Sequence, residues 1–303
     1  METRRAIAVL VAVMSSCHGL AQTRASLDLT NPLNVSAQAL AFKQDSIPAA
    51  DEPANRAASS DTPAASDARI NSGETQKQGL ISRSVKRTVR DQKELYVAPF
   101  QPSNIKWDLV VLAGTGGLMA SDRRIERHLP GGNLSIYSNT SNITIGGLSG
   151  ALALMWGYGI KTHNEHLKEM GTLELETLVN TFFVYTPMQL IAGRQRPGEG
   201  NGYGDFWRHH NINTSFPAGH AMFTTAMATV LAHEYPKPWV KVLAYGAAAT
   251  VIGARFLAHD HWASDEFLGP ALGYFIGSHI FHAHCNPEFN EACHRPSLKS
   301  DQP

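Results

Sequence analysis

The chain has 303 residues, of which 26 are basic and 26 acidic, so its formal net charge is zero. A neutral chain without a lysine- or arginine-rich run lacks the electrostatic attraction that nucleic-acid binding requires, and we exclude nucleic acid as a partner. Apolar residues make up 43% of the chain, which is enough to bury a sizeable core.

The first 21 residues have the pattern of an export signal. Positive residues at 4–5 precede an apolar run at 6–14, and small residues end at Ala21. We therefore expect residues 1–21 to be a cleaved signal peptide and the mature protein to be periplasmic or in the cell envelope. A short uncleaved anchor is one alternative. Another is a lipoprotein joined at Cys17, although Met14 stands where such a signal usually has leucine.

Residues 22–79 are rich in Ala, Ser, Asp, Gln, Thr and Pro and have no apolar period. Such a segment cannot bury enough apolar surface to offset the entropy of ordering it. We predict a low-complexity, mostly disordered spacer over 22–100, within which charged residues 82–93 form a short surface helix.

The apolar content rises from residue 107 onward. Six helix-length segments with turn or charge signals between them follow one another, and no strand-like alternation competes with them. These segments are 107–120, 143–160, 172–193, 220–235, 239–258 and 265–284. They predict an all-α bundle of about six core helices in a domain at 101–285, with a tail at 286–303.

A membrane-spanning helix needs about 20 consecutive apolar residues, whereas polar residues interrupt the runs of this chain. This favours a globular periplasmic bundle, and it leaves a membrane-embedded or membrane-associated form as the alternative.

Two cysteines, Cys285 and Cys293, remain after the expected signal cleavage. In an oxidising compartment they predict a disulfide, or otherwise two free thiols. A small metal site with His282, His284 and His294 is the weaker alternative, because the spacing matches no common zinc pattern. We expect no metal and no cofactor.

Potential cations gather between residues 189 and 265, in a region that is otherwise apolar. They are Arg194, Arg196, His220, Arg255 and His261, and the carboxylate that follows them is Asp265. A buried cluster of positive groups is unfavourable unless an anion neutralises it. The pattern therefore predicts an oxyanion site, above all for phosphate.

Two histidines are candidates for the chemistry at this site. His261 and Asp265 are four residues apart, which on a helix places them on one face. The carboxylate would then orient the imidazole and leave its other nitrogen free to attack. His220, at the expected start of a helix, could protonate a leaving oxygen. The alternative for each is structural: a surface ion pair, or a histidine at a helix terminus without a role.

The remaining candidates would bind the anion. Arg196 and Arg255 can hold phosphate oxygens through their planar guanidinium groups, as can Arg194. The backbone N–H groups at Ala218 and Gly219 precede a helix, where such groups point toward an anion. Gln189, a turn or two before the arginines, is a neutral donor that could reach the same ligand; packing is its alternative role.

The stretches QLIAGRQRP, SFPAGH and ARFLAHDHWASD resemble, in this order, the three signature motifs of the PAP2 superfamily. That superfamily includes type 2 phosphatidic acid phosphatases, bacterial class A acid phosphatases and vanadium haloperoxidases, and the resemblance covers roughly residues 107–284. It implies a helical bundle, with His261 as the nucleophile that forms a phosphohistidine, Asp265 as its orienting carboxylate and His220 as the general acid. It also implies that Arg196, Arg255 and the Gly219 N–H hold the phosphoryl oxygens without a metal.

Two positions depart from the family pattern. Gln189 stands where the family has lysine, and Ala218 stands where it has serine; Arg194 could compensate in part for the missing lysine. Ala254 also replaces a serine, before Arg255. The losses bring into question the strength of anion binding, and they leave both histidines, the carboxylate and the two core arginines in place.

The sequence thus predicts an exported phosphatase acting on phosphomonoesters, with lipid phosphates such as phosphatidate or isoprenoid pyrophosphates first and soluble esters second. One alternative is a catalytically impaired phosphate- or lipid-binding envelope protein. The other is a vanadate-dependent haloperoxidase, against which the missing lysine counts. The substrate's leaving group and the oligomeric state stay open.

Overall fold

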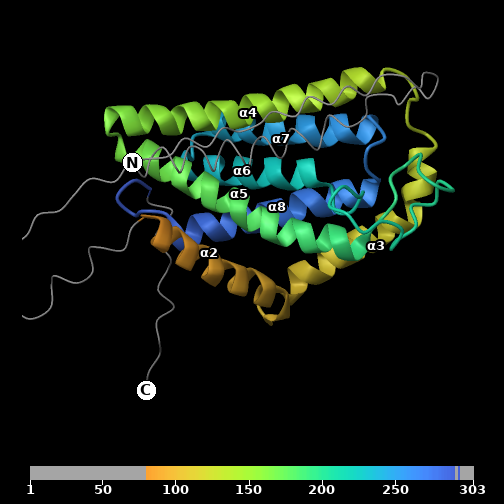
Figure 1. Ribbon diagram of the computed structural model, residues 1–303, viewed down its shortest axis with the longest axis horizontal. Helices are drawn as coiled ribbons and strands as arrows, with labels where there is room; N and C mark the ends of the chain where they lie inside the picture. The colour runs from red at the N-terminus through yellow and green to blue at the C-terminus, as the bar shows by residue number, and fades with distance from the viewer. Residues whose placement is uncertain (1–79, 291–292, 294–303) are drawn as a thin grey trace, which may run out of the picture. The chain divides into compact units, whose positions relative to one another are not determined.

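The structure is a computed structural model that describes residues 80–290 and residue 293, with side chains from Ser84 onward. The expected signal peptide, Cys17 and residues 22–79 of the expected spacer lie outside this part, as does most of the expected tail. The described residues form helices α2 (Leu80–Val97), η1 (Ala98–Phe100), α3 (Ile105–Glu126), α4 (Leu134–Thr162), α5 (Glu165–Ala192), α6 (Gly219–Glu234), α7 (Pro238–Leu257) and α8 (Ala263–His284) (Figure 1).

The described part contains helices and no strand, which confirms the all-α fold, and each of the six expected segments corresponds, to within one residue at its C-terminal end or inside its bounds, to one helix from α3 to α8. Helix α4 begins at Leu134 rather than at 143, and its first turns mix apolar residues with serine, threonine and asparagine, so they give no continuous apolar run. Two of these residues, Ser141 and Asn142, contact Arg255, as described below. Local signals define several ends: the Asn164 side chain caps α5, and Gly193 ends it with φ of 50°.

Helix α6 packs against α5, α7 and α8, and its residues are buried on nearly every side. Three glycines spaced four apart on α8, at 269, 273 and 277, lie against α6. A Cβ atom on Gly273 would come within 2.3 Å of the Met222 carbonyl oxygen, and one on Gly277 within 2.5 Å of the Ala226 carbonyl oxygen. These close contacts bring the two helices that begin at the candidate site into fixed register.

Helix α2 is more than the surface helix expected at 82–93. Its Asp91 is fully buried and lies 2.8 Å from His284 Nε2 of α8, and Gln92 Nε2 donates to Asn180 Oδ1 of α5 at 2.7 Å. The described bundle therefore begins at Leu80 and not at 101. Polar contacts and the packing of Leu95 against the core fix this helix to the bundle, whereas apolar Val85 and Val89, four residues apart, are exposed.

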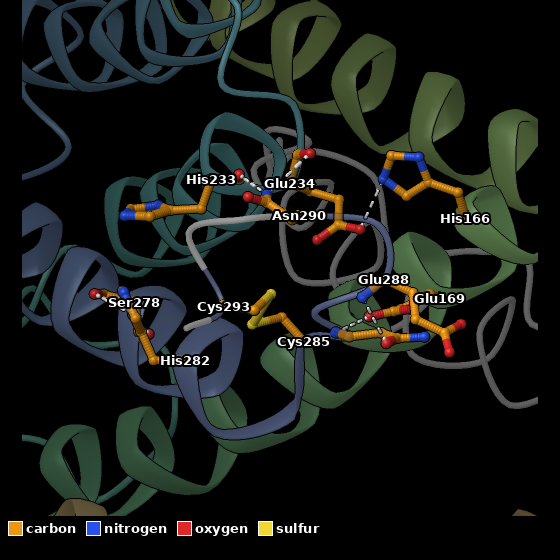
Figure 2. Close-up of a disulfide and its surroundings, with 11 residues drawn as sticks. His166, Glu169, His233, Glu234, Ser278, His282, Cys285, Glu288, Asn290 and Cys293 are labelled. Carbon is orange, nitrogen blue, oxygen red and sulfur yellow. Dashed lines mark hydrogen bonds and ion pairs between the residues drawn. A yellow bond between two sulfur atoms is a disulfide. The ribbon is translucent and has the colours of Figure 1, made fainter. Parts of the chain in front are cut away.

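Cys285 and Cys293 form a disulfide, one of the two states that the sequence left open (Figure 2). The loop that it closes lies against the C-terminal end of α6, where Asn290 Nδ2 donates to the His233 carbonyl oxygen at 2.6 Å. The ring of Phe289 stacks on His166 at the start of α5. The disulfide thus helps to hold residues 285–290 over the end of the bundle at which α6 and α8 terminate.

Glu234, beside this loop, is buried, and one of its oxygens lies 2.9 Å from His166 Nε2 (Figure 2). Burial, and then Glu169, raise the pKa of Glu234 to about 7, whereas burial lowers the pKa of His166. Both shifts favour a neutral pair over an ion pair at neutral pH.

We expect Glu234→Gln to make the protein more stable than the wild type at pH 8 and about equally stable below pH 4.5. A folded-state pKa above the unfolded value means that the stability contributed by protonated Glu234 is complete below the unfolded pKa and is lost as pH rises through about 7. The expected difference at pH 8 is about 2–3 kcal/mol. Thermal unfolding between pH 4 and 9 measures it, and a constant difference between variant and wild type across that range would contradict the assignment.

Two helices, α4 and α7, are long and apolar enough to cross a membrane. Much of their apolar surface faces outward, including Leu154, Val242 and Leu243. The globular alternative expects such residues to be covered, so the exposed faces favour the membrane-associated alternative.

Candidate active site

The three motif stretches meet where α5 ends, α6 begins and α7 leads into α8. Arg255 Nη2 lies 3.0 Å from His220 Nε2, which joins the second and third stretches. Arg196, from the first stretch, is close enough to His261 to lower its pKa. The structure therefore brings together four of the predicted residues as one cluster of potential cations.

His261 lies in the α7–α8 connection and is only 2% exposed. Its Nδ1 is 2.7 Å from the carbonyl oxygen of Ser215, to which it can only donate, so Nε2 carries the lone pair. Burial, then Arg196, hold the pKa of His261 well below its usual value. The ring is therefore neutral at neutral pH, with an available nucleophilic nitrogen.

Asp265 does not orient His261 directly, contrary to the expectation. One carboxylate oxygen accepts from Arg194 Nη1 at 2.5 Å, and the other accepts from Ser215 Oγ at 2.5 Å and from the Trp262 N–H at 3.1 Å. The helical-spacing argument fails because α8 begins at Ala263: His261 lies before the helix, and Asp265 turns back to cap its N-terminus. Asp265 instead acts through Ser215, whose carbonyl positions His261.

Burial raises the pKa of Asp265 to about 6, although Arg194, the Ser215 hydroxyl and the Trp262 N–H all favour the charged form. The carboxylate is thus ionised at neutral pH, as its ion pair with Arg194 requires.

Arg194 is a structural cation and not an anion-binding group. Its guanidinium, 3% exposed, donates to Asp122 Oδ2 at 2.7 Å, to Ser264 Oγ at 2.7 Å and to Asp265. With two carboxylates already bound, it cannot replace the family lysine. It ties α3, through Asp122, to the start of α8.

Arg255 and Arg196 share one carboxylate. Asp260 accepts from Arg255 Nη1 at 2.8 Å, and its other oxygen lies 3.6 Å from Arg196 Nη1. Arg196 also donates to Asn213 Oδ1 at 2.7 Å. Both arginines are therefore held rigidly by neutral or anionic partners, next to His261.

Helix α4 supplies the rest of the support for Arg255. Arg255 Nε donates to Ser141 Oγ at 2.9 Å, and Arg255 Nη2 donates to Asn142 Oδ1. Sequence reasoning missed Ser141, Asn142 and Asp122, because polar residues far from the motifs carry no local signal of this role. It also missed Ser215, although this residue is the first of the second motif stretch, SFPAGH. Asp260, adjacent to His261, could have been found as a polar residue inside the third motif.

His220, in the first turn of α6, accepts a hydrogen bond at Nε2 from Arg255, so that nitrogen is unprotonated. Burial, then Arg255 and His261, hold the pKa of His220 well below its usual value. An oxyanion bound among these groups would raise it, because a negative charge favours the protonated ring. Its role as an acid therefore depends on the bound anion.

Ala218 and Gly219 are both engaged in contacts within the protein. The Ala218 N–H donates to the Asp265 carbonyl oxygen at 3.3 Å and is not free for a ligand, contrary to the expectation. A Cβ on Gly219 would lie 2.7 Å from the Tyr185 ring, so close helix packing requires glycine here. The N–H groups of the first turn of α6 remain available to an anion, as in any helix.

Gln189 is a buried support of the loop before α6. Its Nε2 donates to the Pro217 carbonyl oxygen at 2.8 Å, and its Oε1 accepts from the N–H and the hydroxyl of Thr214 at 2.6 and 2.5 Å. The side chain is fully buried and its amide is occupied on both sides. This arrangement supports the packing role rather than that of an anion donor.

We expect Gln189→Lys to destabilise the protein by about 2–4 kcal/mol without raising turnover. The ammonium group cannot accept from Thr214, and leaving a buried donor unpaired costs about 1–3 kcal/mol. Thermal unfolding and phosphate release measure the two effects, with the exposed Gln101→Lys as the matched control. A variant as stable as wild type and faster in turnover would mean that the lysine reaches the anion.

Comparison with known proteins agrees with the motif resemblance. Residues 173–287 match the family model of the PAP2 superfamily, and this range contains the nine predicted site residues. A stretch of 92 residues is 37% identical to the lipid A 1-phosphatase of Porphyromonas gingivalis, covering 30% of this chain and 20% of that protein. The chain thus aligns with about a fifth of this relative. No solved structure matches.

Proposed function

We propose that the protein is an exported phosphatase that hydrolyses a phosphomonoester of a lipid through a phosphohistidine intermediate. The observation that carries the proposal is His261: a buried, neutral imidazole held at Nδ1 by Ser215, with a free Nε2 beside Arg196 and Arg255. A neutral nucleophile among fixed cations is the arrangement that in-line attack on a phosphate ester needs.

The reaction has two steps. In the first, Nε2 of His261 attacks phosphorus as the bond to the leaving oxygen breaks, and protonated His220 gives its proton to that oxygen. In the second, His220 takes a proton from water, which attacks the phosphohistidine and releases phosphate and neutral His261. Arg196 and Arg255 stabilise the charge on the equatorial phosphoryl oxygens in both transition states.

Two observations support a lipid substrate. The similar protein from Porphyromonas gingivalis is named for a lipid phosphate, and the outward faces of α4 and α7 are apolar. A bundle that contacts the membrane through these helices would meet its substrate at the lipid surface, on the periplasmic side if residues 1–21 direct export.

Phosphate release from purified full-length protein tests the proposal. We expect release from phosphatidate or lipid A in detergent micelles to exceed release from soluble phosphomonoesters, and to persist in EDTA because no metal is expected to take part. Rapid quenching with phosphorus-labelled substrate should trap protein-bound phosphate that is labile in acid and stable in base. A protein that turns over every ester without any such label would contradict the intermediate.

A second candidate, a phosphate-binding protein without turnover, is favoured by two observations. The guanidinium of Arg255 is already engaged by Asp260, Ser141 and Asn142, and the family lysine is replaced by buried Gln189. Saturable binding of a lipid phosphate by a folded protein that releases no phosphate from any ester would favour this candidate.

A further inference from the structure

His259, two residues before the proposed nucleophile, has an unusual backbone conformation. Its φ is 59°, in the left-handed region that only a few per cent of residues other than glycine adopt, histidine, asparagine and aspartate among them more often than the rest. Such a conformation persists only where surrounding contacts determine it. It lies in the short connection between α7 and α8 that also carries Asp260 and His261.

Both ring nitrogens of His259 face hydrogen-bond acceptors from another part of the fold. Nδ1 is bound to a carboxylate oxygen of Glu126, the last residue of α3, and Nε2 lies 3.1 Å from the carbonyl oxygen of Pro130, in the α3–α4 connection. A carbonyl and a carboxylate can only accept, so both nitrogens must donate. This geometry requires the doubly protonated imidazolium, because either neutral tautomer would point a lone pair at an oxygen.

The charges facing the ring agree with this state. Burial lowers the pKa of His259, but the bonds to Glu126 and Pro130 and the nearby charges of Glu126 and Asp260 outweigh it, and the pKa is raised overall. Glu126 on α3 and Asp260 in the α7–α8 connection are therefore the charged groups that raise the pKa of this ring.

Asp260, the residue next to His259, contacts both arginines of the proposed anion site. Asp260 binds Arg255 and lies close to Arg196, and its N–H donates to the Arg255 carbonyl oxygen at 3.2 Å. A shift of the backbone at 259 therefore displaces Asp260, and with it Arg196, Arg255 and the neighbouring His261.

We propose that His259, as an imidazolium bound between Glu126 and Pro130, is a positioning residue that holds Asp260 and His261 in the geometry the reaction needs. The proposal rests on the proposed function. It predicts a pH-sensitive contact, called the latch below. As pH rises and the His259 ring loses its proton, one of its two hydrogen bonds is replaced by lone-pair repulsion. The α7–α8 connection is then held less tightly against the α3–α4 connection.

His259→Asn tests the latch, because asparagine tolerates the left-handed backbone and keeps one donor that does not titrate. We expect kcat/KM at pH 6 to fall by about tenfold to a hundredfold, the effect of losing one charged hydrogen bond. In the ratio of wild-type to variant kcat/KM, we expect a decrease as pH rises through the pKa of His259. His259→Gly should show the same pH-dependent ratio and a larger loss.

His163→Asn is the matched control. His163 is an exposed histidine with φ of 56° at the end of α4, far along the helix from the site, and its replacement should leave kcat/KM and its pH profile unchanged. A thermal unfolding curve of each variant gives the fraction that is folded at the assay temperature, and this separates loss of positioning from loss of folded protein. A ratio of wild-type to His259→Asn activity that is independent of pH would overturn the latch.

Nitrogen NMR of labelled histidine rings makes the latch testable apart from turnover. The signal that disappears in His259→Asn should be that of an imidazolium at pH 6.5, and Glu126→Gln should lower the pH at which it becomes neutral. A ring that is already neutral at pH 6 overturns the latch even if the phosphatase activity is found. An imidazolium signal in a protein that hydrolyses no ester would support the contact and overturn the proposed function instead.

Discussion

His261→Asn is expected to abolish phosphate release, lowering kcat by about 10⁴- to 10⁶-fold, as removal of a catalytic nucleophile does in other enzymes. The asparagine amide can still donate to the Ser215 carbonyl oxygen, as Nδ1 of His261 does. It has no nitrogen able to attack phosphorus, so no phosphohistidine can form. Phosphate release under saturating substrate, together with trapping of labelled protein, measures both losses.

The control for this substitution is His128→Asn, which changes an exposed histidine bonded to the Arg124 carbonyl oxygen. It should retain wild-type turnover. If His261→Asn is folded by thermal unfolding yet keeps more than about a tenth of wild-type kcat, the nucleophile is another group, and the proposed mechanism fails.

Arg194→Gln is expected to destabilise the protein by about 3–5 kcal/mol, the cost of removing one partner from a buried ion pair. Asp122 and Asp265 are both almost fully buried, and each would lose its cation. Since a folded protein is stable by only about 5–15 kcal/mol, this loss is a large part of the total. Chemical denaturation of variant and wild type measures it.

The deficit of Arg194→Gln should also depend on pH. Without the arginine, the pKa of Asp265 rises further above about 6, and protonation then removes the unpaired charge. The destabilisation should therefore be smaller at pH 5 than at pH 8. Arg208→Gln is the matched control, because Arg208 forms an exposed ion pair with Asp205, which contributes about 0–1 kcal/mol. Equal deficits for the two variants would mean that the buried network adds no stability.

The proposed site places two neutral histidines beside two permanent cations. Burial and the arginines hold the pKa values of His220 and His261 low, which suits a nucleophile and opposes an acid. A bound phosphate ester resolves the conflict, because its charge raises the pKa of His220 at the moment when the leaving oxygen needs a proton. Substrate binding and acid catalysis are thus coupled by charge.

The sequence predicted the number and order of the core helices, because apolar runs and turn residues are local signals that survive packing. It also predicted that Arg196, His220, Arg255 and His261 act together, since unpaired cations in an apolar region require a common anion. For the two cysteines it left a disulfide or two free thiols open, and the structure has the disulfide.

Only the tertiary structure decided how these residues are held. Arg194 faces two carboxylates rather than an anion, and Asp265 reaches His261 only through Ser215, because α8 begins after the nucleophile. Gln189 packs where a ligand donor was expected. The direction in which a side chain points depends on which elements surround it. Those surroundings are fixed by contacts between residues far apart in the chain. The composition and spacing of the motifs therefore predicted the class of chemistry, and long-range packing determined which of the predicted residues lie together and which support their neighbours.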